Sequence, residues 1–207
     1  EKNLCMAGGV ALNCVANGKI LRSSIFEHIW IQPASGDAGG ALGVALSINH
    51  LFNYKPREIP DGIDGMQGTY LGPKYKNSQI EMVLKKYEAV YKVMDEKEVV
   101  TLAVSALSEG KILGWFQGRM EFGPRALGNR SILGDARSES MQRTINMKIK
   151  YREGFRPFAP AVLAEQANKF FHIDCKSPYM LLVADVHKER LKALSSESEN
   201  LQGLDKL

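Results

Sequence analysis

The chain has 207 residues, a formal net charge of +4 at pH 7, and 44% apolar and 24% charged residues. This balance argues against a disordered chain, and the length allows one large or two small domains, since domains usually span about 100–150 residues. The small basic excess does not by itself indicate a nucleic-acid partner. Three cysteines without a CxxC pair, no signal peptide and no membrane-spanning apolar run predict a reduced, cytoplasmic protein without a membrane contact.

The N-terminal part of the sequence alternates between strand and helix patterns that glycine turns separate. Such alternation predicts an α/β sheet with helices packed on it. Strands are expected at 3–6 and 28–31, and helices over 10–22 and 37–52.

Residues 54–72 are rich in proline and glycine and have no hydrophobic period, which is typical of a linker. We therefore expect a first unit at 1–55, a linker at 56–70 and a second unit at 71–207. The chain opens on Glu1, in a strand pattern that enters a glycine turn, so we expect a piece of a longer protein.

The second unit contains a helix with clear boundaries, because Asp95 is suited to the N-cap, Glu98 to the capping box and Gly110 to the stop. The polar segment 188–207 is expected to be a mobile loop or tail. The other expected elements are helices over 77–87 and 138–150, a buried strand at 112–116 that includes Trp115, and strands at 158–163 and 179–186.

Two glycine turns are candidate binding features. Gly8 and Gly9 lie between a strand and a helix, where backbone amides can approach a phosphate or a ribose, although a tight turn explains the same pattern. The second turn places Asp37 at a helix start, as an N-cap or as a ligand for a metal or nucleotide. Turns on adjacent strands can face one crevice, so their pairing favours a binding site.

The segment from Arg119 to Arg156 holds seven arginines and two lysines against four carboxylates. The planar fork of arginine grips phosphate or carboxylate oxygens, which predicts the wall of an anion pocket, with internal salt bridges as the alternative. Nucleic acid is disfavoured, because a backbone-binding stripe would hold more lysine and fewer Gly-Pro turns. Glu121 would orient an arginine or help to hold a magnesium-bound triphosphate, the first being favoured. Tyr151 and Phe155 would stack on adenine or, preferably, pack in the core.

Four segments in this order resemble the NodU/CmcH carbamoyltransferases of nodulation-factor and antibiotic biosynthesis. They are MAGGVALNC at 6–14, SGDAGGALG at 35–43, GRMEFGPRALGNRSIL at 118–133 and YREGFRPFAP at 151–160. The resemblance extends over nearly the whole chain to about residue 186.

The resemblance implies an α/β (α+β) protein in which the C-terminal part of an actin/hexokinase-like ATPase-fold domain precedes a YrdC-like domain. In that family the YrdC-like domain makes carbamoyl-adenylate from carbamoyl phosphate and ATP, with Mg²⁺ on the nucleotide. The first domain moves the carbamoyl group to a hydroxyl of a small-molecule acceptor and holds Fe²⁺ or a similar divalent metal. The family's two histidine metal ligands lie upstream and a Thr-Ser-Phe-Asn-type segment lies downstream, so we expect both sites to be incomplete in this chain.

Site residues follow from the resemblance position by position. Asp37 resembles the metal-ligating aspartate. The candidate catalytic residues are Arg119, Arg125 and Arg130, which resemble anion-binding arginines, and Lys150 and Arg152, which resemble a phosphate-binding Lys-x-Arg pair. The candidate cofactor-binding residues are Gly8, Gly9, Asn13, Gly36 and Arg156.

Two other functions compete with an ATP-dependent O-carbamoyltransferase. Both component folds also occur in threonylcarbamoyl-adenosine modification of tRNA, but the order of the two folds and the FGPRALG motif favour transfer to a hydroxyl. A non-catalytic fragment would pair its arginines internally and bind no nucleotide. A homo-oligomer is compatible with the sheet edges that a partial domain would expose.

Overall fold

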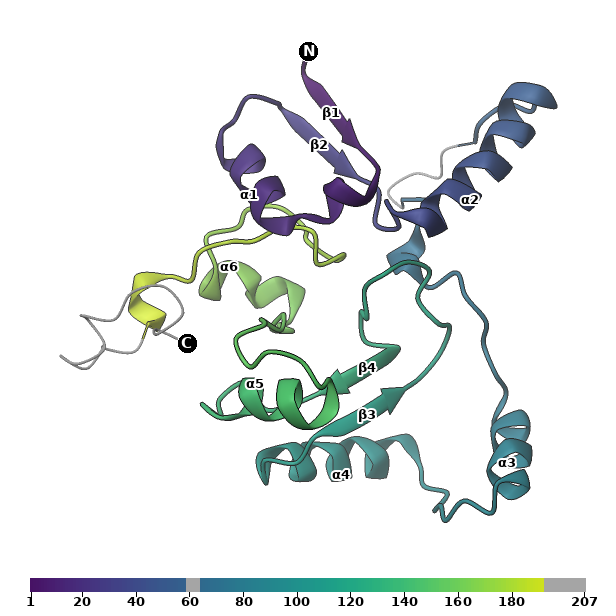
Figure 1. The fold of residues 1–207 in the computed structure, drawn as a ribbon, viewed down its shortest axis with the longest axis vertical. Helices are drawn as coiled ribbons and strands as arrows, with labels where there is room; N and C mark the ends of the chain where they lie inside the picture. The colour runs from purple at the N-terminus through teal and green to yellow at the C-terminus, as the bar shows by residue number, and fades with distance from the viewer. Residues whose placement is uncertain (59–63, 192–207) are drawn as a thin grey trace. The chain divides into compact units, whose positions relative to one another are not determined.

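The structure, a computed structural model, describes residues 1–58 and 64–191 and is a mixed α/β fold with two small sheets (Figure 1). Residues 59–63 of the expected linker and 192–207 of the expected tail lie outside the described residues.

The chain divides into two compact units, each built from segments that are distant in sequence. Unit 1 consists of Glu1–Lys92, Trp115–Ser131 and Ser177–Val183. Unit 2 consists of Val93–Gly114, Ile132–Lys176 and the segment from Ala184 onward. The domain boundaries expected from the sequence follow the chain linearly and stay a prediction.

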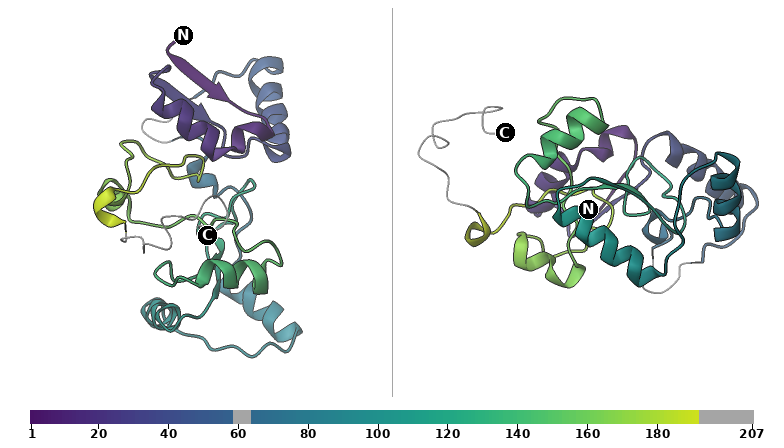
Figure 2. Two further views of the ribbon diagram at one scale, coloured as in Figure 1. Left: turned by 60° about the vertical axis from the view of Figure 1, so that its left-hand side comes forward. Right: turned by 90° about the horizontal axis from the view of Figure 1, so that it is seen from below.

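The first sheet of unit 1 confirms the predicted strands. Strands β1 (Asn3–Met6) and β2 (His28–Ile31) are parallel and lie side by side (Figures 1 and 2). The connection runs through the 3₁₀ helix η1 (Gly9–Leu12) and helix α1 (Cys14–Arg22), as a parallel pair requires a crossover. The predicted helix is interrupted at Asn13, whose side chain accepts the backbone N–H of Ala16 at 3.1 Å and caps α1.

The remaining helices of unit 1 follow the predicted pattern. Helix α2 (Asp37–Ser47) continues into the π-helix η2 (Ile48–Phe52), which confirms the prediction over 37–52. After the short 3₁₀ helix η3 (Gln67–Thr69), helix α3 (Asn77–Lys86) confirms the helix predicted over 77–87.

The core of unit 1 joins the first glycine turn to the segment 177–183. Ala11, Ile31, Tyr179 and Leu181 are buried in this core. Asn17, which is 1% exposed, donates through Nδ2 to the carbonyl oxygens of Ala11 at 2.8 Å and Leu181 at 3.0 Å. The strand predicted at 179–186 was wrong for most of its length, because side chains use the carbonyl groups of Leu181 and Val183. At its end, Val186 forms an isolated antiparallel bridge with Phe171.

The second sheet contains β3 (Leu113–Phe116) and β4 (Arg130–Leu133), and the division between the units passes through both strands. Strand β3 confirms the element predicted at 112–116, but its predicted burial was wrong. Trp115 is half-buried and Phe116 is 56% exposed, because a sheet of two strands covers only part of each side chain.

Unit 2 confirms the capped helix. Helix α4 (Glu96–Ser108) begins after Asp95, which accepts the backbone N–H of Glu98 at 2.8 Å and donates its own N–H to the Glu98 carboxylate at 3.1 Å. The helix predicted over 138–150 corresponds to α5 (Met141–Thr144) and the π-helix η4 (Ile145–Ile149).

The C-terminal part of unit 2 is mostly irregular. The strand predicted at 158–163 was wrong, since Pro157 and Pro160 cannot donate to a strand ladder. The chain there forms the 3₁₀ helix η5 (Ala164–Gln166), helix α6 (Ala167–Phe170) and the 3₁₀ helix η6 (Lys188–Arg190). No helix among the described residues is both long and apolar enough to cross a bilayer.

Candidate anion-binding sites

Both glycine turns leave open space beside their backbone. A Cβ atom added at Gly8 or Gly9 of the first turn, or at Gly36 of the second, would meet no atom within 4 Å. The backbone at these positions therefore has room for a ligand. Asn13 already serves as the N-cap of α1, so its nucleotide role stays a prediction.

The FGPRALG loop reaches both glycine turns within unit 1. Arg125 donates through Nη2 to the carbonyl oxygen of Leu12 at 2.9 Å, and its Nε is buried without a hydrogen-bond partner among residues 1–58 and 64–191. Gly123, at φ +131°, lies so close to Ala34 that an added Cβ would be 3.2 Å from the Ala34 Cβ. The hydroxyl of the neighbouring Ser35 is also buried without a described partner. Because a buried donor without a partner is costly, each of these groups is expected to pair with an ordered water or a polar ligand.

Glu121 organises this loop through its backbone. The side chain is in a residue only 6% exposed, and its Oε1 accepts the N–H groups of Leu127 at 2.7 Å, Asn129 at 2.9 Å and Arg130 at 3.3 Å. Burial raises the pKa of Glu121, but the backbone N–H groups outweigh it and hold the pKa below its ordinary value. Glu121 contacts no guanidinium group in the described structure, so it acts by folding the loop that carries the arginines.

Arg119 and Arg130 donate to neutral oxygens. Arg119 Nη1 is 3.0 Å from the Gly72 carbonyl oxygen, and Arg130 Nη1 is 2.7 Å from that of Gln117. The Arg130 guanidinium carbon also lies 3.4 Å from the centroid of the Phe116 ring. Among residues 1–58 and 64–191, neither guanidinium group forms an ion pair with a carboxylate.

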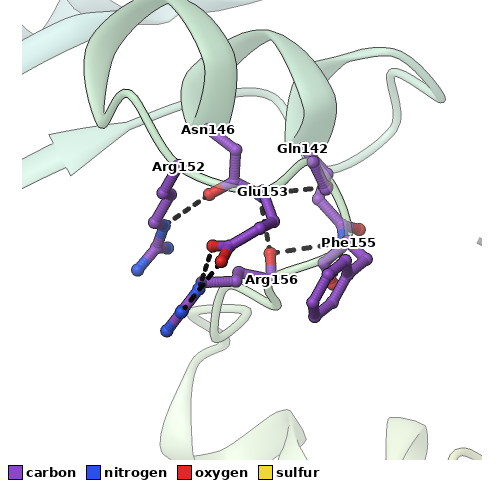
Figure 3. A network of polar contacts seen from close by, with 7 residues as sticks. Gln142, Asn146, Arg152, Glu153, Phe155 and Arg156 are labelled. Carbon is purple, nitrogen blue, oxygen red and sulfur yellow. Dashed lines mark hydrogen bonds and ion pairs between the residues drawn. The ribbon is translucent and has the colours of Figure 1, made fainter.

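A polar network in unit 2 holds the loop that carries Lys150, Arg152 and Arg156 (Figure 3). Asn146, at 0% exposure, donates to the carbonyl oxygens of Gly154 at 3.1 Å and Arg156 at 2.8 Å. Its Oδ1 accepts the Nε–H of Arg152 at 2.7 Å. Lys150 is exposed at the end of η4.

Two arginines of the segment form internal salt bridges instead. Arg156 Nε is 2.7 Å from a Glu153 oxygen, and Arg137 Nη2 is 2.7 Å from an Asp135 oxygen. Hydrogen bonding to Arg137 lowers the pKa of Asp135 to about 2. Arg156 first, and Arg152 to a smaller extent, lower the pKa of Glu153. The binding role of Arg156 stays a prediction.

The described residues do not by themselves form the expected metal site. Asp37 is exposed in the first turn of α2, where Gly36 and not Asp37 is the N-cap. No group of three His, Cys, Asp or Glu residues in the described ranges is placed to hold a metal ion. Asp37 as a metal ligand stays a prediction, and we derive no chemistry through such a metal.

The aromatic residues near the basic loop are not in a core. Tyr151 is 86% exposed and Phe155 is 44% exposed, which overturns the preferred core interpretation. Tyr151 has a φ of +48° just after Lys150, the C-cap of η4, where the chain leaves the helix.

Asn146 was not identified as a site residue from the sequence. Its position four residues after Gln142 could have indicated it, because residues four apart share one face of a helix.

Two family descriptions match the chain. Carbamoyltransferase N-terminus matches residues 1–46, and Carbamoyltransferase C-terminus matches residues 104–199, together more than half of the chain. The chain belongs to the carbamoyltransferase family. The matches confirm the resemblance, since the N-terminal one includes both glycine turns and the C-terminal one includes the arginine-rich segment.

Relatives in this carbamoyltransferase family match almost the whole chain. An uncharacterized protein of Synechocystis sp. is 54% identical over 100% of the chain and 34% of its own length. Nodulation protein NolO of Bradyrhizobium diazoefficiens is 41% identical, over 93% of the chain and 35% of the relative. A 3'-hydroxymethylcephem-O-carbamoyltransferase of Streptomyces clavuligerus is 33% identical, over 90% of the chain and 33% of the relative. The chain thus spans about a third of the length of these relatives.

Proposed function

We propose that the protein is an ATP-dependent O-carbamoyltransferase that activates carbamoyl phosphate with ATP and transfers the carbamoyl group to a hydroxyl of a small-molecule acceptor. The family supports carbamoyl transfer, and a relative is named as an O-carbamoyltransferase. The proposal includes the fold, the C-terminal part of an actin/hexokinase-like domain followed by a YrdC-like domain.

One observation carries the proposal. Arg119, Arg125, Arg130 and Arg152 donate to neutral oxygens and form no ion pair with a described carboxylate, whereas Arg137 and Arg156 do. Carbamoyl phosphate and ATP bring several negative charges together, and two unit charges about 4 Å apart repel by about 4 kcal/mol at an effective dielectric of 20. Arginines that keep their charge can offset this repulsion before and during reaction.

Each unit contains candidate anion-binding groups of its own. In unit 1, Arg125 and the open turn at Gly8 and Gly9 would take the nucleotide phosphates. In unit 2, Lys150 and Arg152 would bind the phosphate of carbamoyl phosphate. Mg²⁺ bound with the nucleotide would further neutralise its phosphate charge.

The reaction proceeds by one hydrolysis and two displacements. Water first cleaves carbamoyl phosphate to carbamate and inorganic phosphate. A carbamate oxygen then attacks the α-phosphorus of ATP, and pyrophosphate leaves with the bonding electron pair. The acceptor hydroxyl then attacks the carbamoyl carbon of the adenylate, loses its proton and displaces AMP. The arginines stabilise the charge that gathers on the phosphate oxygens in the first displacement.

Titration calorimetry with ATP and Mg²⁺, with and without carbamoyl phosphate, tests the proposal. Arg125→Ala is expected to weaken nucleotide binding by about 1–3 kcal/mol, the contribution of a charge-assisted contact. Arg137→Ala is the matched control, since it removes the same charge from an exposed arginine that already pairs with Asp135. Equal affinities for the two variants, or no nucleotide binding by the folded protein, would overturn the proposal.

A further inference from the structure

Asn146 is a fully buried residue whose side-chain amide forms hydrogen bonds through both its nitrogen and its oxygen. Nδ2 donates to the carbonyl oxygens of Gly154 and Arg156, and Oδ1 accepts Arg152 Nε–H (Figure 3). Its backbone carbonyl also accepts the N–H of Arg152 at 3.0 Å. Asn146 therefore fixes both the backbone and the guanidinium group of Arg152.

This contact decides which edge of Arg152 is available. Because Nε is held at 2.7 Å, the two terminal amino groups keep no hydrogen-bond partner among the described residues. The guanidinium carbon also lies 5.1 Å from the centroid of the Phe158 ring, over which the group is placed. A planar guanidinium fixed in this way presents two parallel N–H donors, the arrangement that matches two oxygens of a phosphate.

The neutral amide also preserves the charge. On the same loop, Arg156 uses Nε and Nη2 on the Glu153 carboxylate, which offsets its positive charge. An aspartate at position 146 would do the same to Arg152, whereas asparagine orients the group without placing a negative charge against it. The loop thus contains one arginine that is ion-paired with a carboxylate and one whose direct side-chain partner is a neutral amide.

We propose that Asn146 is a positioning residue that holds the Arg152 guanidinium for the phosphate group of carbamoyl phosphate. The inference rests on the proposed function. Asn146 is 0% exposed, so its proposed effect on the ligand is exerted through Arg152.

A double-mutant cycle in the intact protein separates positioning from folding. Binding of carbamoyl phosphate is measured by calorimetry for Arg152→Ala, Asn146→Ala and the double variant, with urea unfolding of each. Each single change is expected to weaken binding about tenfold, as for a lost charge-assisted hydrogen bond. The double variant is expected to bind as Arg152→Ala does, whereas the part of the stability loss that comes from the Nδ2 contacts to Gly154 and Arg156 is retained in both backgrounds.

Gln142→Ala is the matched control for loop order. Gln142 donates to the carbonyl oxygens of Phe155 and Arg156 on the same loop and has no contact with Arg152. We expect its affinity for carbamoyl phosphate to stay within about twofold of the wild type, since no ligand-facing group moves. Asn146→Asp keeps the shape and an acceptor for Nε but loses the two Nδ2 donations to the loop carbonyl oxygens; it serves if Asn146→Ala does not fold, with its own urea unfolding measured, and is also expected to weaken binding.

The outcomes distinguish the two proposals. Wild-type affinity in Arg152→Ala would overturn the phosphate site of the proposed function and this inference with it. Weak binding in Arg152→Ala together with wild-type affinity in the Asn146 variants would overturn the inference alone. Independent, multiplicative effects in the double variant, or an equal loss in Gln142→Ala, would likewise show that Asn146 does not act through Arg152.

Discussion

Replacing Glu121 by glutamine removes one charge from the centre of the FGPRALG loop and changes little in shape. Its Oε1 holds three backbone N–H groups, at 2.7, 2.9 and 3.3 Å. The amide oxygen of glutamine can accept from the same groups, so the substitution isolates the contribution of the charge.

The size of the effect follows from these contacts. A hydrogen bond to a charged group contributes about 1.5–3 kcal/mol and a neutral one about 0.5–1.5 kcal/mol, so each short contact loses about 1 kcal/mol. Glutamine also avoids the cost of burying a charge, which offsets part of that loss. We expect Glu121→Gln to lower the free energy of unfolding by about 1–2 kcal/mol at pH 7.

The pH dependence has a definite sign. The folded-state pKa of Glu121 lies below its unfolded value. The carboxylate therefore stabilises the fold above an unfolded pKa of about 4.3, and this contribution is lost as pH falls through the folded pKa. The difference in the free energy of unfolding between the wild type and Glu121→Gln should therefore become smaller as the pH is lowered from about 4.3 through the folded-state pKa of Glu121.

Urea unfolding at pH 7 and at successively lower pH values measures both effects. Glu81→Gln is the control, because Glu81 lies in unit 1 on an exposed helix and its ion pair with Lys85 is 3.8 Å long. Such a pair contributes at most about 0.5 kcal/mol. The reasoning fails if Glu121→Gln is as stable as Glu81→Gln at pH 7, or if its deficit grows in acid.

Three further predictions concern the fold. Burial and a hydrogen bond to a carboxylate raise the pKa of Tyr179 to about 12. The free energy of unfolding should therefore fall as the pH rises from about 10 to about 12. Unfolding curves of Tyr179→Phe at alkaline pH should not show this decrease. In α2, Gly43→Ala should raise the free energy of unfolding by about 0.5–1 kcal/mol through helix propensity. Gly39→Ala should lower it, because the added Cβ would meet the Ala34 carbonyl oxygen. Urea unfolding compares the two variants, and equal effects would contradict the close packing at Gly39. Asp95→Ala should cost about 1 kcal/mol through loss of the α4 cap, measured by thermal unfolding, and Asp95→Asn should restore most of it.

Local signals in the sequence were sufficient for most helices and for the first sheet. The capping box at Asp95 and Glu98 marks the start of α4, because the groups that form it are neighbours in the chain. The strands at 179–186 and 158–163 failed for a different reason. Strand formation requires partners, and in the first segment Asn17 and Arg22, more than 160 positions away, take the carbonyl groups.

Some features of the candidate site could likewise be predicted from the sequence, and others depend on the tertiary structure. The sequence by itself determined the family and the supply of arginines, since motifs and residue types are read directly along the chain. Only the tertiary structure decided which arginines are ion-paired with a carboxylate, because Arg125 finds the Leu12 carbonyl oxygen as its partner at a separation of 113 residues. It also decided that Arg156 pairs with Glu153 while Arg152 is held by a neutral amide. Such differences depend on distances and burial between side chains, which residue order does not specify.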